Sequence, residues 1–112
     1  MQLKRILTQA GIKVVGSAGD GHAAVEVVLR ERPDIILMDI NMPGINGLEA
    51  VRLIREEHEA CIVMLTAYAT QEYQTRASEL GVSGYIVKPI TAQTLLPQLY
   101  EAYALFVDRE QL

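Results

Sequence analysis

Apolar and polar positions alternate along this chain at two different spacings. Near the start, apolar residues recur at every third or fourth position, which predicts an amphipathic helix that ends at Gly11. Four later runs are short, apolar and rich in branched side chains, and turn residues bound them, so they predict strands. These strands are expected at residues 12–18, 34–39, 61–67 and 84–87.

Residues with short polar side chains mark the starts of the remaining helices. Asp20 can cap the second helix, and Asn46 followed by Glu49 resembles a capping pair for the third. Thr70 begins the fourth helix, and Thr91 can cap the last one. Helices and strands therefore alternate along the chain.

The last helix is expected at about 91–112. Its apolar residues continue at steps of three and four, and they are Leu96, Leu99, Tyr103 and Phe106. This spacing resembles the seam of a short coiled coil, and it also fits a helix docked on the sheet. Pro97 either lies near the start of the regular helix or kinks its first turn.

Strands that alternate with helices predict a parallel sheet covered by helices on both faces. Each expected strand is too apolar to have a face in water, which supports the same arrangement. We therefore expect an α/β fold with a doubly wound parallel sheet, in one domain over residues 1–112. Ligands of such folds bind beyond the carboxyl ends of the strands, so a site is expected at that edge.

Composition narrows the possible functions. The 112 residues are 50% hydrophobic, enough for one core, and they carry a net charge of −4 with a pI of about 5.1. This charge gives no basic surface for direct nucleic-acid binding. Cys61 lies in an apolar run and is expected in the core of a cytoplasmic protein. No apolar stretch approaches the ~20 residues of a membrane span, so no membrane partner is expected.

Three polar residues directly follow apolar runs. Asp39 follows IILM, Thr66 follows IVML and Lys88 follows YIV, so the ends of the expected strands carry a carboxylate, a hydroxyl and an ammonium. A carboxylate can attack phosphorus, an ammonium can offset the charge of the transferred group, and a hydroxyl can donate to it. Pro89 is a candidate for a cis peptide bond that would aim Lys88.

Taken singly, each of these residues has a plainer explanation. Asp39 could be a turn or cap residue, Thr66 a strand-end cap and Lys88 a solvated surface charge. Tyr85, in the last strand, could be an ordinary half-buried aromatic. The three strand-end residues together favour phosphoryl chemistry over these explanations.

The segments around these residues resemble the receiver domains of two-component response regulators. LMDINMPGINGLEA is similar to the phosphoacceptor segment of that family, MLTAY to its switch segment and GYIVKPIT to its aromatic and lysine segment. The resemblance runs from the first helix to Thr91. It implies a flavodoxin-like three-layer sandwich that is not an enzyme, that a sensor histidine kinase phosphorylates, and that then switches a partner or output surface.

The resemblance also implies a role for each site residue. Asp39 would accept the phosphoryl group and, with the backbone carbonyl of Asn41, would bind Mg²⁺. Thr66 would be the switch hydroxyl, Tyr85 the aromatic that turns inward on activation, and Lys88 the residue that pairs with phosphate.

The start of the chain departs from the family pattern. Receivers normally open with a strand in the middle of the sheet, which ends in an acidic pair that helps to bind Mg²⁺. Both are missing here, so we expect an N-terminally truncated fold, weak Mg²⁺ binding and slow phosphorylation. Either the natural chain begins earlier, or a homodimer forms through the exposed strand edges or the last helix. That helix could also lead into an output domain.

Two other functions fit parts of the sequence. A phosphatase of the haloacid dehalogenase type would use Asp39 as its nucleophile, but it needs a second aspartate where this chain has Asn41. A degenerate receiver-like module, used for binding or dimerisation without efficient phosphorylation, would fit the missing acidic pair.

Overall fold

The computed structural model describes residues 2–41, 44–67 and 70–110 as an α/β fold with a parallel sheet. Strands and helices follow one another as the sequence predicts, with one exception in the region 12–18. The elements in chain order are α1 (Gln2–Gln9), α2 (Gly21–Glu31), β1 (Ile35–Asp39), α3 (Gly47–Arg55), β2 (Cys61–Thr66), α4 (Gln71–Glu79), β3 (Gly84–Val87) and α5 (Ala92–Glu110).

The sheet has the strand order β1-β2-β3, and both strand pairs are parallel. Asp39 is in register with Leu65, and Thr66 is in register with Val87. All six residues of β2 are buried, as expected for the middle strand of a covered sheet. Because the strands run in one direction, their carboxyl ends lie at the same edge of the sheet.

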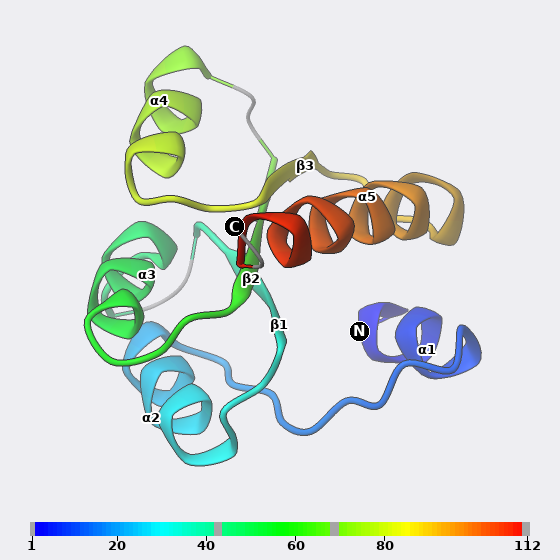
Figure 1. Cartoon of the computed structure of the whole chain (residues 1–112), viewed down its shortest axis with the longest axis horizontal. Helices are drawn as coiled ribbons and strands as arrows, with labels where there is room; N and C mark the ends of the chain where they lie inside the picture. The colour runs from blue at the N-terminus through cyan, green and yellow to red at the C-terminus, as the bar shows by residue number, and fades with distance from the viewer. Residues whose placement is uncertain (1, 42–43, 68–69, 111–112) are drawn as a thin grey trace.

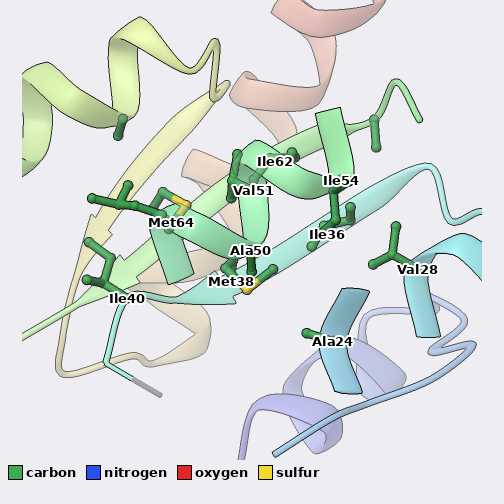
Figure 2. Packing of buried hydrophobic residues seen from close by; sticks show 13 residues of the cluster. Ala24, Val28, Ile36, Met38, Ile40, Ala50, Val51, Ile54, Ile62 and Met64 are labelled. Carbon is green, nitrogen blue, oxygen red and sulfur yellow. The ribbon is translucent and has the colours of Figure 1, made fainter. Parts of the chain in front are cut away.

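Helices cover both faces of this sheet (Figure 1). One face carries α2, α3 and α4, and the other carries α1 and α5. The prediction of three layers is therefore confirmed. Figure 2 shows the cluster on the first face, where side chains of α2 and α3 meet those of β1 and β2. Buried members of the cluster on the second face include Val63, Leu65, Ile86, Leu95 and Leu99.

Four helices start at the capping residues that the sequence indicates. The side chains of Asp20, Asn46, Thr70 and Thr91 accept hydrogen bonds from backbone N–H groups three residues later, at 2.8, 2.9, 3.3 and 3.2 Å. Gly11 follows α1 and Gly81 follows α4, with φ angles of +81° and +77° in the left-handed region. These turns were predictable because a cap depends only on neighbours in the sequence.

The prediction of a strand at residues 12–18 is wrong. This segment forms no strand, and it runs as an irregular connection from α1 to α2 (Figure 1). Within the part of the chain that the structure describes, no backbone hydrogen bond joins residues 13–19 to β1. A strand needs a neighbour at hydrogen-bonding distance, and here cavities separate the segment from β1.

The last helix differs from its prediction in which residues it buries. Pro97 lies inside α5, and the helix packs on the sheet through Leu95, Leu99 and Ala102, with Phe106 partly buried. Leu99 and Phe106 of the predicted stripe pack on the sheet, but Leu96 is only half-buried and Tyr103 is exposed, and Leu95 and Ala102 take their places. Both sets of residues have helical spacing, and only packing against β2 and β3 selects one. Residues 111–112 lie outside the described residues.

Candidate functional site

The structure brings Asp39 and Lys88 together at the carboxyl edge of the sheet. Asp39 is the last residue of β1, and Lys88 directly follows β3. Lys88 Nζ donates to Asp39 Oδ2 at 2.5 Å, and the backbone N–H of Asn41 donates to Asp39 Oδ1 at 3.0 Å. The side chains are 33% and 27% exposed, so the ion pair can be reached from solvent.

Thr66 lies between these residues, at the end of the middle strand. Its residue is 1% exposed, and its carbonyl oxygen accepts the backbone N–H of Lys88 at 2.7 Å. This bond fixes the backbone of Lys88 relative to β2. The Lys88–Pro89 peptide bond is cis, as predicted. The structure thus places Asp39, Thr66 and Lys88 at one edge.

Tyr85 lies on the face of the sheet that α4 covers. It is partly buried and packs against the cluster on that face. It also borders a cavity of about 230 Å³, which is lined on the other side by Gln74, Ala77 and Ser78 of α4. A movement of the Tyr85 ring would therefore change the packing next to α4.

Gly47 is part of the site, although the sequence patterns do not identify it. This first residue of α3 donates its N–H to the carbonyl of Ile40 at 2.9 Å. A β-carbon at Gly47 would lie 2.8 Å from Ile40 Cα and closer still to the carbonyl oxygen of Asp39. Only glycine therefore lets α3 start against the backbone of Asp39 and Ile40. The available signal was a glycine directly after the Asn46 cap.

Cys61 also lies in the middle strand, at the opposite end of β2 from Thr66. It is fully buried, and this burial raises the pKa of its thiol. The thiol therefore stays protonated at neutral pH, and it is a core residue as predicted.

The described residues around Asp39 do not fit a tight Mg²⁺ site. Among residues 2–41, 44–67 and 70–110, no three His, Cys, Asp or Glu side chains are grouped so that they could hold a metal ion. Asp39 already binds Lys88 and the N–H of Asn41, and the side chain of Asp20 caps α2. Residues 42–43 and 68–69, within the quoted motifs, lie outside the described residues.

Comparison with known proteins decides the family. The sequence model of the response regulator receiver domain family matches residues 1–100 of this chain. The chain belongs to this family. Its flavodoxin-like fold agrees with that of solved receivers, such as the chemotaxis protein CheY4 of Vibrio cholerae. That structure has a TM-score of 0.84 and 32% identity, over 90% of this chain and 86% of that chain.

Two further proteins are similar to this receiver domain: one is a longer regulatory protein, and the other was solved in a complex. It is 37% identical over 106 residues to the transcriptional regulatory protein PdtaR of Mycobacterium tuberculosis, covering 95% of this chain and 52% of that protein. The chain thus spans about half the length of this relative. The CheX–CheY–BeF₃–Mg²⁺ complex of Borrelia burgdorferi has a TM-score of 0.86 and 28% identity, over 91% of this chain and 78% of that chain.

In the described part of this receiver domain, no helix is both long and apolar enough to span a bilayer.

Proposed function

We propose that this chain is the phosphoacceptor receiver of a two-component response regulator. A sensor histidine kinase in the cytoplasm phosphorylates Asp39, and the modified domain switches a partner or output surface. The observation that carries the proposal is the contact of Lys88 Nζ with Asp39 Oδ2 at 2.5 Å, at the edge where Thr66 ends the middle strand. The proposal is supported because a carboxylate, an ammonium and a residue with a hydroxyl lie at one edge of the sheet.

The chemical step is the transfer of a phosphoryl group to the Asp39 carboxylate. A carboxylate oxygen attacks the phosphorus of a phosphohistidine, and the bond between phosphorus and the imidazole nitrogen breaks. The electron pair stays on that nitrogen, which then takes a proton. The product is an acyl phosphate on Asp39. The Lys88 ammonium, already beside Oδ2, moves to the phosphoryl oxygens and offsets their charge.

Phosphorylation would then be transmitted through Thr66 and Tyr85. The Thr66 hydroxyl donates to a phosphoryl oxygen, and Tyr85 turns inward to fill the space that Thr66 leaves. The position of Tyr85 beside α4 supports this route, because a turn of the ring repacks the face of that helix. The surface formed by α4 and α5 changes shape, and phosphate favours one of two existing arrangements.

We expect Mg²⁺ to bind weakly to this chain. Receiver domains generally bind Mg²⁺, but the described residues here provide one carboxylate at the site, Asp39, with the Asn41 carbonyl. Mg²⁺ needs near-octahedral oxygen ligation and gives up its waters reluctantly. Titration with Mg²⁺, followed by NMR shifts of the Asn41 amide, should therefore saturate only at concentrations far above those needed by a receiver that has the acidic pair. Saturation at similar concentrations would contradict this.

Among the described residues, Asp39 is the one carboxylate at the site, and this supports a second candidate function. The second candidate is a receiver-like binding module without efficient phosphorylation. Incubation with acetyl phosphate and Mg²⁺, followed by intact mass spectrometry, separates the two. We expect one labile phosphate, which Asp39→Asn abolishes and Asp34→Asn retains. Asp34 is a suitable control because it lies exposed at the opposite end of β1. No phosphate on the unmodified chain would support the silent module, and steady release of phosphate would support an enzyme.

A further inference from the structure

The first residue of α2 lies in direct contact with the segment that follows β1. Gly21 is buried, and a β-carbon on it would lie 3.1 Å from the carbonyl carbon of Ile45 and closer still to the carbonyl oxygen and Cγ1 of that residue. A larger residue would therefore push α2 and Ile45 apart. α2 begins against the backbone of Ile45, which only a glycine allows.

The start of α2 is itself held in place. The Asp20 side chain accepts the N–H of Ala23 at 2.8 Å and so caps the helix. One turn later, Ala24 is buried in the cluster on the face that α2 shares with α3 (Figure 1). His22 also lies beside the segment, since a β-carbon at Gly44 would be 3.6 Å from its Cδ2. α2 thus presents a fixed surface to the segment between β1 and α3.

Ile45 connects this surface to the end of β1. Its side chain is half-buried and packs against the same cluster, and the next residue, Asn46, caps α3. Gly47 follows, and it meets the backbone of Asp39 and Ile40 at a second contact that only glycine allows. Packed backbone segments transmit a displacement, because the protein interior is hardly compressible. A shift of α2 would therefore reach Asp39 through Ile45 and Gly47.

The carboxylate of Asp39 depends on this backbone for its orientation. Its Oδ1 accepts the N–H of Asn41 at 3.0 Å, and its Oδ2 accepts from Lys88 Nζ at 2.5 Å. A shift of the backbone at Asp39 would move the carboxylate relative to both donors. Attack on phosphorus requires a nucleophile held within a narrow range of distances and angles. Such a shift would therefore slow the transfer even when the domain stays folded.

We propose that Gly21 is a positioning residue for the phosphorylation of Asp39, an inference that rests on the proposed function. The start of α2 braces Ile45, and Ile45 in turn sets the start of α3 against the end of β1. Gly21 therefore acts on the orientation of the acceptor and not on the binding of the phosphodonor. This route enters the site from α2, and it is separate from the proposed route through Thr66 and Tyr85.

Gly21→Ala in the full chain tests this role. We expect the maximal rate of phosphorylation by acetyl phosphate to fall about tenfold or more, while the half-saturating concentration stays within about twofold. Before phosphorylation, the NMR signal of the Asn41 amide proton should move upfield, because its hydrogen bond to Asp39 Oδ1 is weakened. Gly19→Ala should change neither, since a β-carbon there has no neighbour within 4 Å.

A second variant keeps the test decisive if Gly21→Ala does not fold. Ile45→Ala removes the side chain that Gly21 braces and creates no overlap, and it should give the same slower rate and the same upfield shift. Ile12→Ala is its matched control. Ile12 is also half-buried, but it packs against the cluster on the other face, near the opposite end of β1 from Asp39. Ile12→Ala should lower stability without moving the Asn41 signal.

The outcomes separate a failure of this inference from a failure of the proposed function. No phosphate on the unmodified chain would contradict the proposed function, and this inference with it. Phosphorylation of the unmodified chain, with equal rates and unchanged Asn41 signals in Gly21→Ala and Ile45→Ala, would overturn the positioning role alone. So would a slower rate caused only by a higher half-saturating concentration, or an equal shift of the Asn41 signal in Ile12→Ala.

Discussion

Lys88 and Asp39 form the central contact of the site, and their energetic and chemical roles differ. Both side chains remain about one-third exposed or less, so water screens their attraction only in part. An ion pair of this kind contributes at most about 1 kcal/mol to stability. On the proposed function, the larger effect of Lys88 would be on the phosphoryl group, whose charge would increase the demand for a cation next to Asp39.

Replacement of Lys88 by alanine should therefore separate stability from activity. We expect Lys88→Ala to lower the free energy of unfolding by no more than about 1 kcal/mol, and to slow phosphorylation by acetyl phosphate about tenfold or more. Urea denaturation and a mass-spectrometric time course measure the two effects. Lys4→Ala, at an exposed position of α1, is the matched control and should change neither. A normal rate in Lys88→Ala would contradict the assigned role.

Single residues at the strand ends were predictable to different degrees. Asp39, Thr66 and Lys88 could be located because each follows an apolar run, and the parallel topology then brings such ends together. Gly47 was missed, because its importance comes from a contact with distant backbone that no local pattern indicates. The roles assigned to the strand-end residues and Tyr85 stay predictions until activity is measured.

At the scale of elements, the start of α3 sets the position of the β1 end. Gly47→Ala would place a methyl group against the backbone of Asp39 and Ile40. We expect this variant to lose about 1–3 kcal/mol of stability. We also expect it to be phosphorylated more slowly, because the backbone of Asp39 must shift. Thermal unfolding and acetyl phosphate labelling measure these effects.

The control for this variant is Gly19→Ala. A β-carbon at Gly19 would have no neighbour within 4 Å, so stability and labelling should stay close to those of the unmodified chain. If both variants behaved alike, the close contact between α3 and the end of β1 would not matter to the site.

Arg55 connects the end of α3 to the turn between α4 and β3. Its guanidinium donates to the carbonyl of Gly81, and its side chain is 17% exposed. Arg55→Ala should lower the free energy of unfolding by about 1–3 kcal/mol, because the partly buried carbonyl loses its donor. Arg52 makes two ion pairs, with Glu49 and Glu56, but it is 49% exposed.

Arg52→Ala is therefore the matched control, and it should destabilise the domain less than Arg55→Ala in urea denaturation. The comparison tests whether burial or the number of ion pairs determines how much an arginine contributes to the free energy of unfolding. A larger loss in Arg52→Ala would show that the exposed pairs, and not the connection to Gly81, hold this side of the domain together.

Elements were predictable where local interactions determine them. The four predicted caps are confirmed, because each side chain accepts a hydrogen bond from the N–H three residues later. The predicted strand at 12–18 does not form, because a strand depends on a neighbour elsewhere in the chain, and cavities separate this segment from β1. The buried face of α5 was predicted only in part, because two sets of apolar residues fit the same helical period, and contacts with the sheet select one.

At the scale of the whole molecule, two apolar clusters on opposite faces hold one sheet, and the candidate site lies where its strands end. β1 is therefore supported on both faces by these clusters and on one side by β2, and Asp39 lies at its carboxyl end.

The most direct test of the proposed function locates the phosphoryl group. The chain is treated with acetyl phosphate, and sodium borohydride then reduces the acyl phosphate, which converts the modified aspartate to homoserine. Tandem mass spectrometry of the peptides identifies the converted residue. We predict conversion at Asp39 alone, and its loss when acetyl phosphate is omitted. Conversion at another aspartate, with Asp39 unchanged, would contradict the account.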